Sequence, residues 1–186
     1  MSNKRSILKS DRVELVLTEE EHLEKRVAYI NDPELQKTLN FDYPTSLSKT
    51  RKWFNKTLLD NTRVDFSILD QKNKEMIGFC GFLNIEVPVM KAEVYIAIGN
   101  KDYWGKGYGR EANKLLHNYG FIERGFNRIY SYHLAHNERM RKNSEALGKK
   151  IEAHFRESIY SHGELKDQYL AAILRSEWEN NEAYDI

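Results

Sequence analysis

The chain has 186 residues, of which 40% are hydrophobic and 31% charged, and its 29 Lys+Arg against 28 Asp+Glu give a net charge of +1. This length and composition suit one globular domain over residues 1–186 and exclude a disordered or fibrous chain. A net charge near zero argues against nucleic acid or an acidic membrane as the main partner. The single cysteine, Cys80, excludes an internal disulfide and a cysteine zinc cage, and no apolar run approaches the ~20 residues of a membrane span.

The N-terminal part of the sequence predicts one strand followed by helices. In chain order these are a strand over Arg12–Leu17, a helix over Glu19–Ile30, a short second helix, and a helix from Ser46 or Ser48 to Leu59. Thr18 and Glu21 have the spacing of a capping box, which favours a helix start at that point. An aromatic loop over residues 40–44 precedes the last of these helices.

The middle of the chain predicts three consecutive strands. Val64–Leu69 and Met76–Ile85 flank a polar turn at Gln71–Lys74, so we expect a hairpin. Val89–Gly99 is the strongest strand signal, and its later part, Val94–Ile98, is apolar almost throughout. Such a run is typical of a central strand that is covered on both faces.

The C-terminal half alternates helices and strands. We expect a glycine-rich turn, a helix to about Glu123, a strand over Arg128–Leu134, a helix over Asn137–Leu147, and strands over Ile151–Tyr160 and Gln168–Arg175 joined by a turn at His162-Gly163. Residues 1–10 and 179–186 are expected to be loose. The order β-α-α-β-β-β-α-β-α-β-β predicts the α/β class, with a mixed sheet of about seven strands and helices on both faces. Residues 89–134 form a right-handed βαβ crossover within it.

The segment Trp104–Gly109 carries three glycines between the strongest strand and a helix. A helix N-terminus offers free N–H groups, and glycines let an anion approach the backbone, so a phosphate or pyrophosphate site is favoured. Lys106 and Arg110 add positive charge. The spacing fits neither a P-loop, which needs Lys-Ser/Thr after the last glycine, nor a dinucleotide fingerprint. Taken alone, the glycines also suit a helix start without a ligand.

The residues from Ala92 to Ala112 resemble motif A of the GNAT superfamily, R/Q-x-x-G-x-G/A. Trp104 stands where R/Q is usual, as in the branch related to ribosomal-protein alanine and spermidine N-acetyltransferases. The resemblance extends from Arg12 to Trp178. It implies a GNAT-like fold whose two central strands, 92–99 and 128–134, splay apart at the glycine loop.

The resemblance also implies acetyl-CoA as cosubstrate and no metal. The pyrophosphate would be cradled by the backbone of Trp104, Gly105, Lys106, Gly107, Tyr108, Gly109 and Arg110, and the pantetheine arm would pair with Ile96, Ala97 and Ile98. A backbone N–H near Ile96 would hold the thioester oxygen as it gains charge. Asn137 would hydrogen-bond the pantetheine amide, and Lys142 would meet the outer phosphate.

The attacking amine must lose a proton, and Glu93 is the candidate base because it lies on the central strand. Its side chain shares a face with Tyr95, which we expect to contact the acceptor. The alternative is a solvated charge or a partner for Lys91. The position where the family often has an acidic tyrosine holds Ser144, so either Tyr132 protonates the thiolate or it leaves without a dedicated acid.

Phe41 and Tyr43 are expected to line the acceptor pocket, with simple packing against Pro44 as the alternative. His133 and His136 lie three residues apart on a strand and so point to opposite faces, which excludes a shared metal. The composition predicts a cytoplasmic protein, and the resemblance implies an N-acetyltransferase acting on a primary amine of a small molecule or a protein N-terminus. A non-catalytic acyl-CoA-binding module is the alternative. A homodimer through the terminal strands is compatible with the sequence but is not fixed by it.

Overall fold

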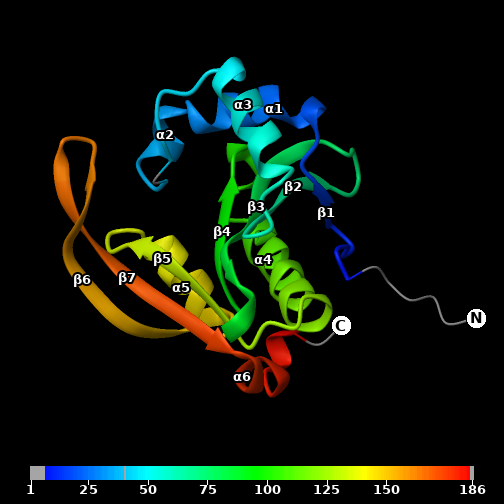
Figure 1. Ribbon diagram of the computed structural model, residues 1–186, viewed down its shortest axis with the longest axis vertical. Coiled ribbons are helices and arrows are strands. Elements are labelled where there is room, and N and C mark those ends of the chain that lie inside the picture. The colour runs from blue at the N-terminus through cyan, green and yellow to red at the C-terminus, as the bar shows by residue number, and fades with distance from the viewer. Residues whose placement is uncertain (1–6, 40, 185–186) are drawn as a thin grey trace, which may run out of the picture.

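The computed structural model describes residues 7–39 and 41–184, so expectations for residues 1–6, 40 and 185–186 fall outside it. Seven strands form one sheet in the order β1-β2-β3-β4-β5-β7-β6 (Figure 1). Their bounds are β1 Val13–Leu17, β2 Val64–Asp70, β3 Met76–Glu86, β4 Lys91–Ile98, β5 Arg128–Leu134, β6 Lys150–Ser161 and β7 Glu164–Leu174. β4 and β5 pair in parallel and the other neighbours antiparallel, which confirms the predicted mixed sheet.

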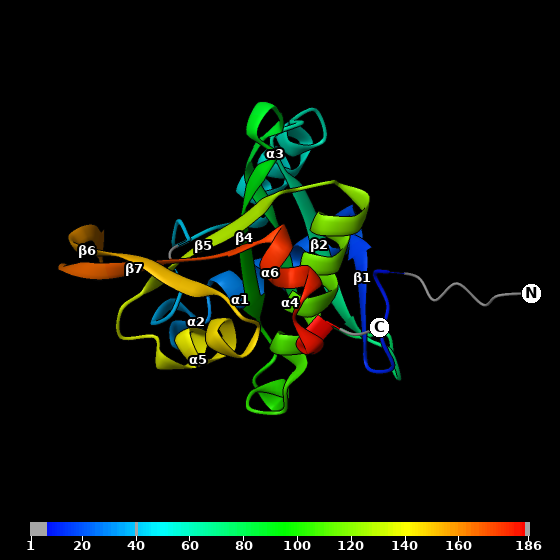
Figure 2. The same ribbon diagram turned by 90° about the horizontal axis from the view of Figure 1, so that it is seen from below.

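Helices cover both faces of this sheet. They are α1 Leu23–Ile30, α2 Pro33–Gln36, α3 Leu47–Thr57, α4 Tyr108–Asn118, α5 Glu138–Ala146 and α6 Arg175–Glu179, with 3-10 turns at Glu20–His22, Val87–Val89, Lys101–Tyr103 and Glu182–Tyr184 and a π-turn at Tyr119–Glu123. Figure 2 shows the β6–β7 hairpin projecting away from the rest of the sheet, on the side opposite β1. Within the described residues, no helix has the length and apolar character needed to cross a bilayer.

Side chains of β4 alternate between two buried environments. Ala92 and Val94 belong to one core cluster with Leu116 of α4. Ala97 belongs to a second cluster with Tyr29 of α1 and Phe79 of β3. β4 is therefore covered on both faces, as its apolar run predicts. We call these two sides the α4 face and the α1 face of the sheet.

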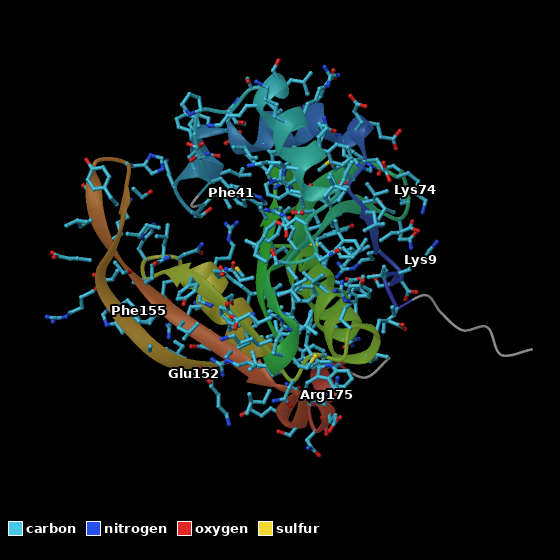
Figure 3. All side chains as sticks on the ribbon, in the orientation of Figure 1. Lys9, Phe41, Lys74, Glu152, Phe155 and Arg175 are labelled. Carbon is cyan, nitrogen blue, oxygen red and sulfur yellow. The ribbon has the colours of Figure 1, made fainter. Side chains whose placement is uncertain are left out.

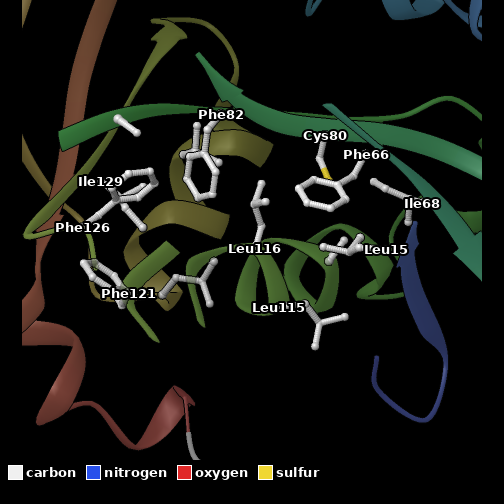
Figure 4. Packing of buried hydrophobic residues seen from close by; sticks show 14 of the residues in the cluster. Leu15, Phe66, Ile68, Cys80, Phe82, Leu115, Leu116, Phe121, Phe126 and Ile129 are labelled. Atoms are coloured by element: carbon white, nitrogen blue, oxygen red, sulfur yellow. The ribbon is translucent and has the colours of Figure 1, made fainter. Parts of the chain in front are cut away.

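The larger core cluster lies between the sheet and α4 (Figure 4). Phe82, Leu116 and Ile129 are fully buried there, together with Cys80. Burial raises the pKa of the Cys80 thiol well above its usual value, and a thiol without thiolate character is a poor nucleophile. Cys80 is thus a buried thiol of low reactivity.

The first helix starts differently from the prediction. The 3-10 turn precedes α1, and the backbone N–H of Glu19 donates to His22 Nδ1 over 3.0 Å. The Thr18 hydroxyl instead lies 3.4 Å from Ser67 Oγ, and the Thr18 N–H donates to the carbonyl of Asp65. A capping box at Thr18 is therefore wrong, because pairing between β1 and β2 continues through that residue. Ser46, by contrast, does cap α3 by accepting from Lys49 N.

The C-terminal segment is more ordered than its polar sequence indicates. β7 begins four residues earlier than predicted, at Glu164, because the turn at His162-Gly163 is tight, with φ of 54° and 82°. Residues 175–179 form α6 rather than the end of a strand. Tyr184 is only 5% exposed, and its hydroxyl lies 2.6 Å from His117 Nδ1. The expected loose tail is therefore not found over residues 179–184.

Candidate active site

The pairing of β4 with β5 stops after three residue pairs. The last of them is Glu93 with Tyr130, whereas β4 continues beside β3 to Ile98 and β5 beside β7 to Leu134. The two central strands thus separate within the sheet (Figure 1). We call the separated parts, residues 94–98 and 131–134, the splay. It confirms the splayed central strands predicted from the sequence, and it leaves backbone groups that an extended ligand can pair with.

A glycine loop, Trp104–Arg110, follows β4 and opens α4. Gly107 is the N-cap of α4 with φ of 86° and no side-chain cap. Gly105 has φ of 73°, and a Cβ there would meet no atom within 4 Å. The first N–H groups of a helix have no partner within the helix and carry the positive end of its dipole. The loop therefore presents backbone donors beside the end of β4.

Arg12 fixes this loop from outside. Its Nη1 donates to the carbonyl of Lys106 over 3.0 Å, its Nε donates to Glu111 Oε2 over 2.8 Å, and its guanidinium lies 4.8 Å from the centroid of the Tyr108 ring. Sequence reasoning missed Arg12, because nothing local connects it with residues about a hundred positions away. The side chains of Lys106 and Arg110 are exposed, and neither forms an ion pair in the described part of the chain.

Trp104 packs the loop onto the end of β4. Its Nε1 donates to the carbonyl of Ile98 over 2.8 Å, and the guanidinium of Arg139 from α5 lies 4.7 Å from its ring centroid. A Cβ on Gly109 would lie 3.3 Å from Ile98 Cγ1, so the helix start is close to the strand. The tryptophan that departs from the R/Q pattern thus connects β4 with α5.

Helix α5 holds three of the predicted residues. Asn137 is its N-cap, and its Oδ1 accepts from Met140 N over 3.1 Å, so this oxygen is already engaged. Lys142 is exposed. Ser144 is 2% exposed, and its Oγ lies 3.3 Å from His133 Nε2. Ser144 is therefore fixed by a buried neighbour.

Basic groups are buried between β5, α4 and α5. Lys149 is 4% exposed and donates from Nζ to Ser131 Oγ over 2.9 Å, and burial lowers its pKa to about 7. Burial, with the nearby Lys149 charge as a second cause, lowers the pKa of His133 to about 4. The same two causes lower the pKa of His117, which is fully buried. These groups favour their neutral forms, which makes the fold sensitive to acid.

We expect the free energy of unfolding to fall by about 2 kcal/mol between pH 6.5 and pH 5 on account of His133 alone. In the unfolded chain a histidine takes up a proton below about pH 6.5, whereas His133 in the fold resists protonation down to about pH 4. Acid therefore favours the unfolded state over this range. Denaturant unfolding across the range is the measurement.

The substitution His133→Gln should reduce this pH dependence, and His154→Gln serves as the control. His154 lies on the exposed hairpin, where its Nε2 is 2.7 Å from Asp167 Oδ2. Equal pH slopes for the wild type and His133→Gln would contradict this explanation.

Glu93 lies on the α1 face where the splay begins. It is half-buried, and Asn84 Nδ2 donates to its Oε2 over 2.8 Å. Burial raises its pKa, with the Asn84 hydrogen bond opposing the rise. Lys91 does not pair with it and lies 3.0 Å from Glu86 instead. Among the described residues, Glu93 has no cationic partner, and its raised pKa suits a general base.

Tyr130, rather than Tyr132, is the tyrosine beside Glu93. The two are register partners on adjacent strands, and burial together with the charge of Glu93 raises the pKa of Tyr130. Tyr132 is 44% exposed and lies two residues further along β5. The ring centroids of Tyr130 and Tyr132 are 6.0 Å apart. The sequence indicates Tyr132 but not Tyr130, because the register of the parallel strands is not encoded locally.

The α1 face above the splay carries an aromatic cluster. The ring of Phe41 makes edge contacts with Phe79 and Tyr95, at centroid distances of 5.5 and 6.0 Å. Figure 3 labels Phe41, on the segment that follows α2. The Tyr95 hydroxyl donates to Asp65, and burial raises the pKa of Tyr95. The structure thus brings together Phe41 and Tyr95, while Tyr43 is 48% exposed and stands apart.

Two histidines connect the second half of the sheet with α2. His136 Nε2 donates to the carbonyl of Lys37 over 3.0 Å, and His162 Nε2 donates to the carbonyl of Gln36 over 2.8 Å. The β5–α5 connection and the tip of the β6–β7 hairpin therefore reach across to α2 (Figure 1). These contacts limit the splay on the α1 face.

The protein-family model for the Acetyltransferase (GNAT) domain matches residues 12–150 of the chain. The chain is 30% identical over 174 residues to "Uncharacterized N-acetyltransferase p20" of Bacillus licheniformis, covering 92% of this chain and 97% of that relative. It is 33% identical over 79 residues to "Uncharacterized N-acetyltransferase YnaD" of Bacillus subtilis, covering 42% and 46%. The spermidine N-acetyltransferase from Vibrio cholerae in complex with CoA and spermine has the same fold, with a TM-score of 0.85 and 24% identity over 92% of this chain and 100% of that one.

Proposed function

Because the chain belongs to the GNAT acetyltransferase family, we propose that it transfers the acetyl group of acetyl-CoA to a primary amine by direct attack inside the splay. One observation carries this proposal. The parallel pairing of β4 and β5 ends at Glu93, and the glycine loop lies at the far end of the same separated strand. The glycine loop, as the proposed anion site, and Glu93, as the proposed base, would thus lie at the two ends of one extended backbone segment.

The donor is proposed to bind along this segment. The backbone N–H groups of the glycine loop, residues 104–110, would hold the pyrophosphate, supported by the uncapped start of α4 and the exposed charges of Lys106 and Arg110. The pantetheine would pair with residues 96–98 as an added strand. Asn137 retains its amide N–H groups for a pantetheine oxygen, and Lys142 is exposed beside it for the outer phosphate.

The chemistry requires a neutral amine and a stabilised oxyanion. Glu93 would take the proton of the ammonium group, since its burial favours proton uptake and the described part of the chain offers it no cationic partner. The amine then attacks the thioester carbon, and a backbone N–H of β4 near Ile96 stabilises the charge on the oxygen. Tyr95 and Phe41 would contact the acceptor from the same face.

Helix α5 has no tyrosine that could protonate the leaving thiolate. Ser144 occupies the position where the family often has a tyrosine, but it is buried against His133. It would therefore not protonate the thiolate. Tyr132 remains a candidate donor, and Tyr130 is supported more strongly by its position beside Glu93. Departure without an acid is also compatible with the chemistry, because the pKa of a thiol, about 8.5, is close to neutral.

The direct test is release of free CoA thiol from acetyl-CoA with a panel of amines. We expect thiol release for at least one class, together with a mass increase of one acetyl group on the amine. The panel should include spermine, because the similar Vibrio cholerae structure holds it. CoA binding measured by calorimetry, without thiol release across the panel, would favour a non-catalytic acyl-CoA-binding module instead.

Three further expectations belong to this proposal. A single domain over residues 1–186 is supported by the one sheet that contains strands from residue 13 to residue 174. A homodimer through the terminal strands is supported by the exposure of Ile151, Phe155 and Tyr160 on the β6 edge. A cytoplasmic location rests on the sequence and stays a prediction.

A further inference from the structure

Arg26 of α1 is buried without a counter-ion. Arg26 is 3% exposed. Its guanidinium carbon lies 4.3 Å from the ring centroid of Trp53 and 4.1 Å from that of Phe79. Its Nη1 has no hydrogen-bond partner in the part of the chain that the structure describes. Across residues 7–39 and 41–184, Arg26 forms no ion pair.

The nearby carboxylate of Asp65 is already committed to other groups. Arg63 donates to both Asp65 oxygens over 2.7 Å, and the Tyr95 hydroxyl donates to Asp65 as well. Two arginines and one aspartate leave this cluster with one positive charge. Stacking on aromatic rings stabilises a guanidinium, but a buried charge without a partner remains unfavourable. An anion bound beside Arg26 would offset that cost.

The cluster adjoins the proposed acceptor position. Tyr95 is two residues from Glu93 on the same face of β4, or about 7 Å along the strand. Phe41 contacts the Tyr95 ring, and the Arg26 guanidinium lies 6.0 Å from the Phe41 centroid. An acceptor with its amine at Glu93 and its body along Tyr95 and Phe41 therefore extends toward Arg26.

The carboxylates around this face do not favour a polycation. Glu86 is paired with Lys91, Glu152 with Arg128 and Asp42 with Lys49. Among the described residues, the side chain of Glu93 has only the neutral Asn84 as a partner. A polyamine would need several free carboxylates for its several charges. The face instead offers one carboxylate for one amine and one uncompensated arginine further along.

From this arrangement we propose that the acceptor is a small amine that also carries a carboxylate, and that Arg26 binds the carboxylate. This inference rests on the proposed transfer reaction for its amine end. Arginine suits the role because its planar group can donate two parallel hydrogen bonds to a carboxylate. The ligand class is therefore amino acids in the broad sense, with the amine at the α-carbon or at the far end of the chain.

The test compares matched amines with and without the carboxylate: 6-aminohexanoate with hexylamine, and phenylalanine with phenethylamine. For at least one pair we expect kcat/KM to be ten-fold or more higher for the acid in the wild type. Arg26→Met should bring that ratio near one. Arg51→Met is the matched control, since Arg51 is an exposed arginine on α3 paired with Glu20, and it should keep the wild-type ratio. Ratios near one in the wild type, or a ratio that survives Arg26→Met, would overturn the proposal.

Binding without turnover separates the two proposals. Hexanoate, which has the carboxylate but no amine, should bind the CoA-loaded wild type in calorimetry. It should bind at least ten-fold more weakly to Arg26→Lys. This variant keeps the positive charge, so it can be used if Arg26→Met does not fold. If no amine releases thiol but hexanoate binding depends on Arg26, the transfer reaction fails and the anion site stands. If thiol is released and hexanoate does not bind, the anion site fails and the transfer reaction stands.

Discussion

Replacing Gly107 with aspartate should abolish CoA binding, with affinity reduced at least 100-fold. Gly107 has φ of 86° and begins α4 without a side-chain cap. A carboxylate there would stand against the pyrophosphate, and two unit charges about 4 Å apart repel by about 4 kcal/mol at an effective dielectric constant of 20. Calorimetric titration with CoA is the measurement.

Gly163→Asp is the matched control for this substitution. Gly163 also has a positive φ, 82°, and a Cβ there would meet no atom within 4 Å. It therefore imposes the same backbone strain and the same added charge, but in the turn of the β6–β7 hairpin. Its CoA affinity should stay within two-fold of the wild type. Unchanged affinity in Gly107→Asp would disprove the assignment of the glycine loop to the pyrophosphate.

The substitution Glu93→Gln should lower kcat about 100-fold and leave CoA affinity unchanged, because general-base catalysis contributes about 10²–10⁴-fold. Glutamine keeps the size of the side chain and an oxygen for Asn84, so the local fold should persist. Wild-type turnover should fall as the pH drops through the raised pKa of Glu93, since the protonated carboxyl cannot accept another proton. That acidic decline should disappear in the variant.

Glu86→Gln provides the comparison for Glu93. Glu86 lies at the end of β3, is half-exposed and pairs with Lys91 at 3.0 Å, so its replacement removes a charge nearby without touching the proposed base. We expect turnover within two-fold of the wild type. If Glu93→Gln also stays within two-fold at every pH, Glu93 is not the base.

Much of the fold follows from local patterns in the sequence. The apolar run at Val94–Ile98 predicts a strand covered on both faces, and the glycines at 105, 107 and 109 predict a tight connection into a helix. Both features depend on neighbouring residues alone. The hairpin of β2 and β3 was predictable for the same reason, since its turn is short.

The parts that could not be predicted depend on contacts between distant residues. Arg12 meets Glu111 across 99 positions, and Tyr130 faces Glu93 only because the parallel register aligns them. Nothing in the local sequence distinguishes Arg26 from an exposed helix charge, because its burial depends on packing against Trp53 and Phe79. The position of the C-terminal segment likewise depends on a distant contact, because the Tyr184 hydroxyl lies 2.6 Å from His117 Nδ1.

The early end of the β4–β5 pairing also bears on how stable this protein can be. Had the two strands remained in register as far as Ile98, the sheet would have gained several backbone hydrogen bonds, each worth about 1 kcal/mol net. Substitutions that draw the strands together should therefore be attractive in any selection for thermostability and damaging in any selection for turnover, a conflict common to binding sites. The splay therefore lowers stability in favour of the proposed activity, and engineering of this protein should preserve it.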